Sequence, residues 1–149
     1  MYTAGKLIYF DPFYFKSGNE SKPKYFLVLK VIEHSVVLAS LPSSQMHLPQ
    51  NQEINHGCLE IPESCINCYI FKAKIPITKS GWYFEFDTFL YGFWLDDYTI
   101  EELQENHPIA NVDYEIVGEL HDSELHNVVN CFSKSSSVKR KYKKMLSKQ

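Results

Sequence analysis

Two apolar runs face each other across a short polar turn in the stretch KPKYFLVLKVIEHSVVLASL, residues 22–41. Residues 25–33 are rich in β-branched and aromatic side chains, which favour strands. Residues 33–35 are polar, and residues 35–41 form the second apolar run. This pattern predicts a β-hairpin. Pro23, between two lysines, marks the junction between a polar loop and the first strand.

The sequence on both sides of the hairpin predicts further short strands. Residues 5–11 form a short apolar run, and the loop after it runs from Pro12 to Ser21. Residues 42–57 are polar and contain two prolines, which indicates a second long loop. The remaining expected strands are residues 58–63, 68–75, 82–95 and 114–120.

Helix signals come late in the chain. Thr99 and Glu102 fit a capping box that opens a short helix, and His107-Pro108 ends it. Asp122 or Ser123 is expected to cap a second helix, with one apolar face. That face consists of Leu125, Val128, Val129 and Phe132. A third helical face follows in a basic tail, at Val138, Tyr142, Met145 and Leu146.

Many short strands with a few late helices predict a compact α+β, mainly β or barrel-like fold whose main helices are C-terminal. A chain of 149 residues fits one domain. We expect this domain to span residues 1–133, followed by a basic and possibly helical tail over residues 134–149.

Composition excludes several classes of protein. The chain is 44% hydrophobic and 15% aromatic, which is not the composition of a disordered protein. It has no run of about 18 apolar residues, so we expect no membrane contact. The first residues lack the features of a secretory signal, and four cysteines are too few for a secreted disulfide scaffold. We therefore expect a cytoplasmic protein.

Charge is distributed unevenly along the chain. The net charge is −3, and residues 134–149 contribute +7 to it, which leaves −10 for residues 1–133. A general polyanion-binding surface needs clustered cations. Any nucleic-acid site is therefore expected to be local, either at the loop that carries Lys16, Lys22 and Lys24 or in the tail.

Four parts of the chain follow one another in an order that resembles a known family. These parts are residues 5–11, residues 22–31, residues 36–45, and residues 84–103 with 116–132. The order of a first strand, a basic residue with Pro before an apolar strand, a strand ending in a hydroxyl-containing turn, and a closing strand–helix–strand–helix is similar to the MazF/PemK group. These small toxins are the ribonucleases of type II toxin–antitoxin pairs. The resemblance covers most of residues 4–133.

The resemblance implies a fold, an activity and partners. The fold would be a small SH3-like β-barrel with short helices, usually assembled as a homodimer. The activity would be that of an endoribonuclease, which cleaves single-stranded RNA by transesterification without a metal, so no cofactor is expected. A cognate antitoxin protein would hold this activity in check.

The resemblance also implies site residues. The family's key Arg, which precedes the Pro, falls on Lys22, and its key Thr falls on Ser43, or on Ser44 if the register slips by one. Lys is a point charge where Arg is a planar fork, but it still stabilises negative charge that develops on phosphorus. Lys22, with help from Lys24, would stabilise the transition state, and Ser43 would hold the phosphate.

RNA cleavage without a metal also needs groups that take and give protons. His47 lies a few residues beyond Ser43 on the same loop and is the natural acid or base. The aromatic loop Phe13-Tyr14-Phe15 offers rings on which splayed bases can stack.

The cysteines suggest a separate hypothesis. Cys65 and Cys68 form a C-x-x-C pair, with His56 and Cys58 upstream. Three thiolates and one imidazole would make a Cys₃His zinc site. The alternative is that Cys68, at the head of an apolar strand, is a small buried side chain.

A second function also fits the sequence. The Arg is missing and the body of the chain is acidic, so the same barrel could be catalytically inactive and serve as a module that binds a protein or a nucleic acid. Convergence of Lys22, Ser43 and His47 on one concave surface would favour the enzyme.

Overall fold

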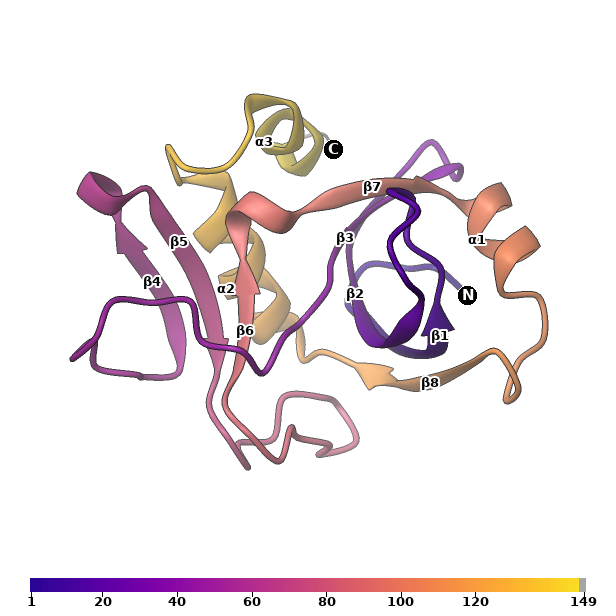
Figure 1. The fold of residues 1–149 in the computed structure, drawn as a ribbon, viewed down its shortest axis with the longest axis horizontal. Coiled ribbons are helices and arrows are strands. Elements are labelled where there is room, and N and C mark those ends of the chain that lie inside the picture. Colours follow the sequence, from indigo (N-terminus) through magenta and orange to yellow (C-terminus); the bar gives the residue numbers. More distant parts are fainter. Residues whose placement is uncertain (148–149) are drawn as a thin grey trace.

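Antiparallel strands in two sheets make up most of the fold in the computed structural model, which describes residues 1–147 (Figure 1). The strands are β1 (Lys6–Phe13), β2 (Lys22–Ile32), β3 (Val36–Ser40), β4 (Gly57–Ile61), β5 (Ile66–Phe71), β6 (Thr88–Tyr91), β7 (Asp96–Thr99) and β8 (Tyr114–Glu119). The helices are α1 (Ile100–Asn106), α2 (Asp122–Ser133) and α3 (Arg140–Ser147), with 3₁₀ turns η1 (Pro62–Ser64) and η2 (Gly92–Trp94). The expected mixed α+β class is confirmed.

The first sheet has the strand order β7-β3-β2-β1-β8 and the second β4-β5-β6. The first sheet curls strongly (Figure 1). Its edge strands β7 and β8 do not pair with each other, so no closed barrel forms among the strands of residues 1–147. The two sheets meet at Ser43. This residue follows the end of β3 and pairs with Phe89 of β6.

The predicted hairpin is confirmed as β2 and β3, but β2 begins earlier than expected. Its pairing with β1 extends back to Phe13 opposite Lys22. Pro23 is tolerated inside the strand because β3 pairs with β2 only from Leu27 onward, opposite Ser40. Where a strand has no neighbouring strand on one side, a proline loses no inter-strand hydrogen bond on that side.

The prediction of one long strand over residues 82–95 is wrong. Within this range only β6 is a strand; η2 follows it, and β7 begins after the range, at Asp96. Asp87 stops the chain from extending before β6, because its carboxylate accepts the backbone N–H of Ala73 at 2.9 Å and pairs with Lys72 at 3.0 Å. The aromatic residues before Asp87 belong to a loop that joins β5 to β6 (Figure 1). We call this loop, residues 72–87, the strap.

The helix signals are mostly confirmed. Thr99 and Glu102 form the expected capping box at the start of α1, and α1 ends before His107. The predicted cap of α2 is wrong, because His121 is the N-cap and forms no side-chain cap bond. Asp122 instead lies 3.5 Å from the Lys79 ammonium. No helix within residues 1–147 has the length and apolar character needed to span a bilayer.

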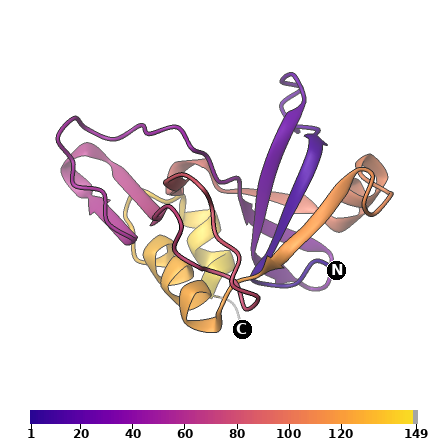
Figure 2. The ribbon, with the colours of Figure 1, turned by 90° about the horizontal axis from the view of Figure 1, so that it is seen from below.

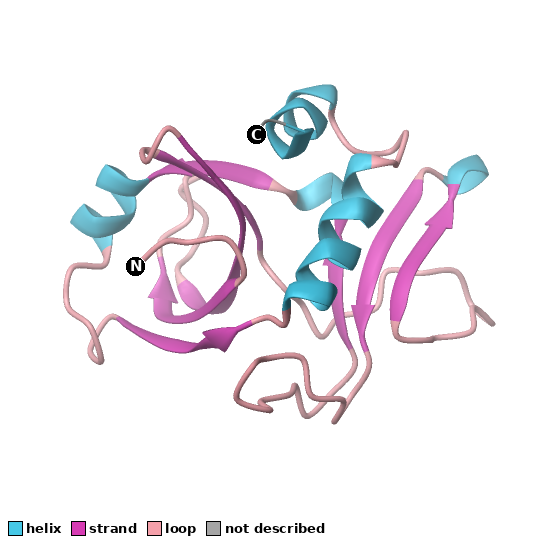
Figure 3. Cartoon of the chain, turned by 180° about the vertical axis from the view of Figure 1, so that it is seen from behind, coloured by secondary structure: helices cyan, strands magenta, loops and turns pink. Residues whose placement is uncertain are grey.

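Helices α2 and α3 lie side by side between the two sheets (Figures 2 and 3). The predicted apolar face of α2 is confirmed, with Val128 and Phe132 fully buried. The expected boundary at residue 133 needs correction, because Val138, Tyr142 and Leu146 of the tail belong to the same core cluster. The apolar positions of the tail are spaced to reach that core, so residues 134–147 are part of the domain.

A second core, inside the curl of the first sheet, holds His107. This imidazole is 2% exposed and stacks on the Phe13 ring at 5.4 Å. Its Nε2 accepts the backbone N–H of Tyr14 at 3.3 Å, so the proton lies on Nδ1, which donates to the Leu103 carbonyl at 3.2 Å. Burial lowers the pKa of His107, against a smaller opposing effect of that carbonyl.

We expect His107 to make stability depend on pH. The unfolded chain takes up a proton at the ordinary histidine pKa of about 6.5, whereas the folded chain does so only at lower pH. The contribution of His107 to stability is therefore complete above about pH 6.5, and it falls as the pH drops below that value. Urea unfolding at about pH 8 and about pH 5 should show a smaller loss for His107→Phe than for the natural chain. His34→Gln, in the exposed β2–β3 turn, should behave as the natural chain does; equal losses in all three would contradict the prediction.

At Gly92 the backbone of η2 packs closely against Asn67 and Val138 of the core. A Cβ at this position would lie 2.3 Å from Asn67 Oδ1 and 2.8 Å from Val138 Cγ2. Asn67 is fully buried, and its amide donates to the Cys131 carbonyl at 3.2 Å, so it has little room to move. Gly92→Ala should therefore lower the free energy of unfolding by about 1–3 kcal/mol. Thermal unfolding of Gly92→Ala measures this, and an unchanged midpoint would show that the site can relax.

Candidate functional site

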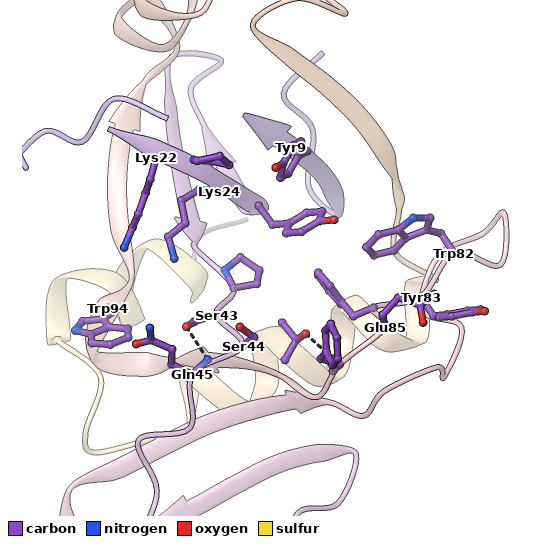
Figure 4. Close-up of a pocket in the computed structure, with 16 residues that line it drawn as sticks. Tyr9, Lys22, Lys24, Ser43, Ser44, Gln45, Trp82, Tyr83, Glu85 and Trp94 are labelled. Atoms are coloured by element: carbon purple, nitrogen blue, oxygen red, sulfur yellow. Dashed lines mark hydrogen bonds between the residues drawn. The ribbon is translucent and has the colours of Figure 1, made fainter. Parts of the chain in front are cut away.

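The first two cations of β2 lie on one face of the strand. Lys22 and Lys24 are two residues apart, and alternate residues of a strand point to the same side. Figure 4 shows both amino groups pointing toward the segment that carries Ser43 and Gln45. Neither lysine forms an ion pair within residues 1–147, so both charges are available to a ligand.

Ser43 is held in place by backbone and turn hydrogen bonds. Its N–H donates to the Phe89 carbonyl at 3.0 Å, and its carbonyl accepts the Phe89 N–H at 2.7 Å. Its hydroxyl accepts the N–H of Gln45 at 3.1 Å. A hydroxyl that accepts one bond can still donate its hydrogen, so Ser43 can bind a phosphate oxygen opposite the two lysines.

Aromatic rings form the opposite wall. Tyr9 and Tyr25 of the first sheet lie 4.8 Å apart between ring centroids. Tyr25 in turn contacts Trp82 of the strap at 5.7 Å and Phe84 at 5.0 Å. The strap is fixed by the backbone bonds of Lys74 to Phe84 and of Ile77 to Trp82. Rings held in place on the wall of a pocket are suited to stacking against flat ligands.

These groups line one open pocket of about 780 Å³. Lys22, Lys24, Ser43 and Ser44 all belong to it, as do Trp82 and Trp94. Glu85 is its one carboxylate, and Figure 4 shows it on the strap, beside Tyr83. A second pocket, also of about 780 Å³, shares Lys22, Lys24 and Trp94 with the first. The two form one groove with Trp94 between them.

The electrostatics of the groove distinguish its two lysines. The pKa of Lys24 is lowered, first by burial and second by the neighbouring charge of Lys22. Lys24 therefore gives up its proton more readily than an ordinary lysine.

His47 does not line the groove. Its ring packs against Trp94 at 5.3 Å and Tyr91 at 5.5 Å. Its backbone N–H donates to the Tyr91 hydroxyl at 2.7 Å, and that hydroxyl donates to the Gln45 carbonyl at 2.6 Å. His47 thus supports the rim from outside, and its role as acid or base stays a prediction.

The other predicted binding residues have different surroundings. Lys16 lines the second pocket, but its ammonium pairs with Asp96 at 3.2 Å and lies over the Tyr98 ring at 5.0 Å. Phe15 also lines the second pocket. Phe13 is fully buried and cannot stack on a base, and Tyr14 packs on His107, away from both pockets. The prediction of base stacking is therefore wrong for Phe13, while for the exposed Tyr14 it stays a prediction.

The zinc hypothesis is contradicted. Cys58 forms a disulfide with Cys131 that joins β4 to α2. Cys68 is fully buried, and burial raises the pKa of its thiol to about 12, while Cys65 is exposed. No group of three or more His, Cys, Asp or Glu side chains in the described part of the chain is placed to hold a metal ion. The C-x-x-C spacing puts Cys65 in a turn and Cys68 inside β5, so the two cannot act together.

The disulfide also bears on the expected location. Disulfides persist mainly in oxidising compartments and are rare in the cytosol. The bridge weighs against a cytoplasmic location, which stays a prediction.

His56 belongs to a separate network beneath the second sheet. Its Nδ1 accepts the backbone N–H of Lys72 at 3.1 Å, so its proton lies on Nε2 and faces the Glu124 carboxylate at 3.0 Å. The Tyr69 hydroxyl donates to the same carboxylate. Because neither ring nitrogen has a free lone pair, this imidazole cannot take a proton from a substrate. The network is structural.

The sequence reasoning missed the aromatic wall and the second pocket. Trp82, Tyr83 and Trp94 fall within the strand expected over residues 82–95, and none of them lies in a strand of the structure. No family model, no curated protein and no solved structure matches this chain, so the site is assigned from its geometry alone.

Proposed function

We propose that this protein is a metal-independent endoribonuclease that binds single-stranded RNA in the groove, as the resemblance to the MazF/PemK toxins implies. One observation carries the proposal: Lys22, Lys24 and Ser43, from distant parts of the sequence, line one pocket with an aromatic wall. Cations for phosphate, a hydroxyl, and rings for unpaired bases are the groups that single-stranded RNA requires.

The two lysines divide the proton transfers. Lys24 acts as the base: its deprotonated form, which the lowered pKa favours, takes the proton of the ribose 2′-hydroxyl. The 2′-oxygen attacks phosphorus, the P–O5′ bond breaks, and the Lys22 ammonium gives a proton to the leaving 5′-oxygen. The Ser43 hydroxyl donates to a non-bridging phosphate oxygen. The products are a 2′,3′-cyclic phosphate and a 5′-hydroxyl, and solvent returns the proton from Lys24 to Lys22.

The resemblance to the MazF/PemK toxins adds three elements to the proposal. The curled first sheet would be an open variant of the SH3-like barrel. An antitoxin segment with acidic side chains would compete with RNA for Lys22 and Lys24. A homodimer would form as in the resembling toxins.

The test is cleavage of a long unstructured RNA by the purified protein in the presence of EDTA. We expect fragments that end in 2′,3′-cyclic phosphate, and far fewer of them from Lys22→Ala. Expression of the natural chain should arrest growth, and Lys22→Ala should relieve the arrest. Intact RNA after prolonged incubation with the natural chain would refute the ribonuclease.

A second candidate is a binding module that holds single-stranded nucleic acid without cleaving it. The observation in its favour is that no imidazole and no guanidinium line the groove. This candidate predicts that the natural chain binds RNA and leaves it intact, and that Lys22→Ala loses the affinity for RNA. Binding and cleavage assays on the same protein sample separate the two candidates.

A further inference from the structure

Within residues 1–147, cations that have no acidic partner lie mainly at two places. Lys74, which lies at neither, is the exception. The first is the groove, with Lys22 and Lys24. The second is the C-terminal segment, where Lys141 alone pairs with an acid, Asp97, at 3.3 Å. The unpaired cations of this segment are Lys134, Lys139, Arg140, Lys143 and Lys144.

The basic segment is fixed to the domain rather than loose. Tyr142 and Leu146 of α3 are buried in the main core. The Tyr142 hydroxyl donates to Asp96 at 3.2 Å and to Asp97 at 3.3 Å. The opposite side of α3 faces outward, where Arg140 and Lys144 line a shallow hollow of about 460 Å³. Fixed cations bind a phosphate backbone at a lower cost in entropy than mobile ones.

The segment that carries this basic face contacts the chain on both sides of Trp94, the ring shared by both pockets. Just before Trp94, Gly92 packs closely against Val138, at the start of the basic segment. Just after it, Asp96 lines the second pocket and contacts Tyr142 of α3. The negative charges between the two surfaces are offset, because Lys16 pairs with Asp96 and Lys141 with Asp97.

We propose that single-stranded RNA continues from the groove past Trp94 and onto the outward face of α3, where Lys139, Arg140 and Lys144 contact its phosphates. This inference rests on the proposed function and gives it an extended substrate. RNA is favoured over an acidic protein because the path is continuous with the aromatic wall, which suits bases. The face supplies affinity without taking part in the chemistry.

The test compares short and long oligouridylates, of about 4 and about 16 nucleotides, labelled with fluorescein. The variant carries Lys139→Gln, Arg140→Gln and Lys144→Gln, all on exposed side chains. The longer RNA should bind at least about tenfold more weakly, and the slope of log affinity against log salt should fall by about 2, near 0.7 for each lost phosphate contact. Binding of the short RNA, which the groove alone holds, should not change.

The matched control carries Lys6→Gln, Lys72→Gln and Lys79→Gln, which remove the same charge from side chains already paired with acids. An equal loss in the control would mean that only net charge matters, and an unchanged salt slope in the α3 variant would mean no contact; either overturns the path. Polyglutamate that competes as well as the long RNA would assign the face to an acidic protein instead.

The groove is tested separately with Lys22→Ala, which removes the ammonium that the groove offers to the phosphate. If this variant binds both RNAs normally, the proposed function and the path fall together. If it weakens both RNAs while the α3 variant weakens neither, only the path falls.

Discussion

Lys24→Ala should reduce RNA cleavage by roughly 10²- to 10⁴-fold, the usual contribution of a general base. The reason is that Lys24 combines a lowered pKa with a place in the same pocket as Ser43. Single-turnover cleavage of a saturating RNA measures the effect on the chemical step. Lys74→Ala, which removes an exposed lysine that does not line the pocket, is the control.

The pH profile provides a sharper form of this prediction. A base must be neutral to act, so the rate should rise with pH through the pKa of Lys24. Removing the charge of Lys22 raises the pKa of Lys24, because that charge is one of the two causes that lower it. The residual activity of Lys22→Ala should therefore rise at higher pH than that of the natural chain. If the rate of Lys22→Ala instead rises at the same pH as that of the natural chain, or at lower pH, Lys24 is not the base.

Cys58→Ser should lower the free energy of unfolding by about 4 kcal/mol, because the bridge to Cys131 closes a loop 73 residues long. For a chain of this size the thermal midpoint should fall by roughly 10 °C. The bridge ties β4 to α2, and α2 supports the core beneath the second sheet. Thermal unfolding with and without a thiol reductant measures the loss.

Cys65→Ser is the matched control, since Cys65 is exposed and free. It should unfold as the natural chain does, and a reductant should add nothing to the effect of Cys58→Ser. If the reductant leaves the natural midpoint unchanged, the bridge does not contribute to stability.

The hairpin and the first helix could be predicted because their determinants are local. Residues 22–41 contain both strands and the turn between them, and Thr99 with Glu102 fixes the start of α1 within four residues. Lys22 and Ser43 were assigned to one site from order alone. That assignment agrees with their shared pocket because the hairpin returns the chain to the start of β2.

Other features depend on contacts between distant residues and left no local signal. The Cys58–Cys131 bridge spans most of the second half of the chain, whereas the nearby C-x-x-C pattern pointed to the wrong partners. Phe13 sits in a loop by sequence but is buried against His107, which lies far along the chain. Sequence patterns read within a short window cannot report such pairs.

The aromatic strap shows the same limit most clearly. Aromatic enrichment over residues 82–95 indicates strands, yet the carboxylate of Asp87 binds Ala73 and Lys72 and turns the chain. The turn places Trp82 on the wall of the groove instead of in a sheet. The hydrogen bond from the Ala73 backbone to the Asp87 side chain thus explains why this segment forms a loop instead of a strand.

Photo-crosslinking tests most directly whether the groove holds single-stranded RNA. An oligouridylate that carries 5-iodouridine is irradiated with the protein, and mass spectrometry identifies the joined residue. We expect crosslinks to Trp82, Tyr83 or Trp94, the rings that line the groove. Crosslinks confined to Tyr14, an exposed ring that lines neither pocket, would contradict the proposed site.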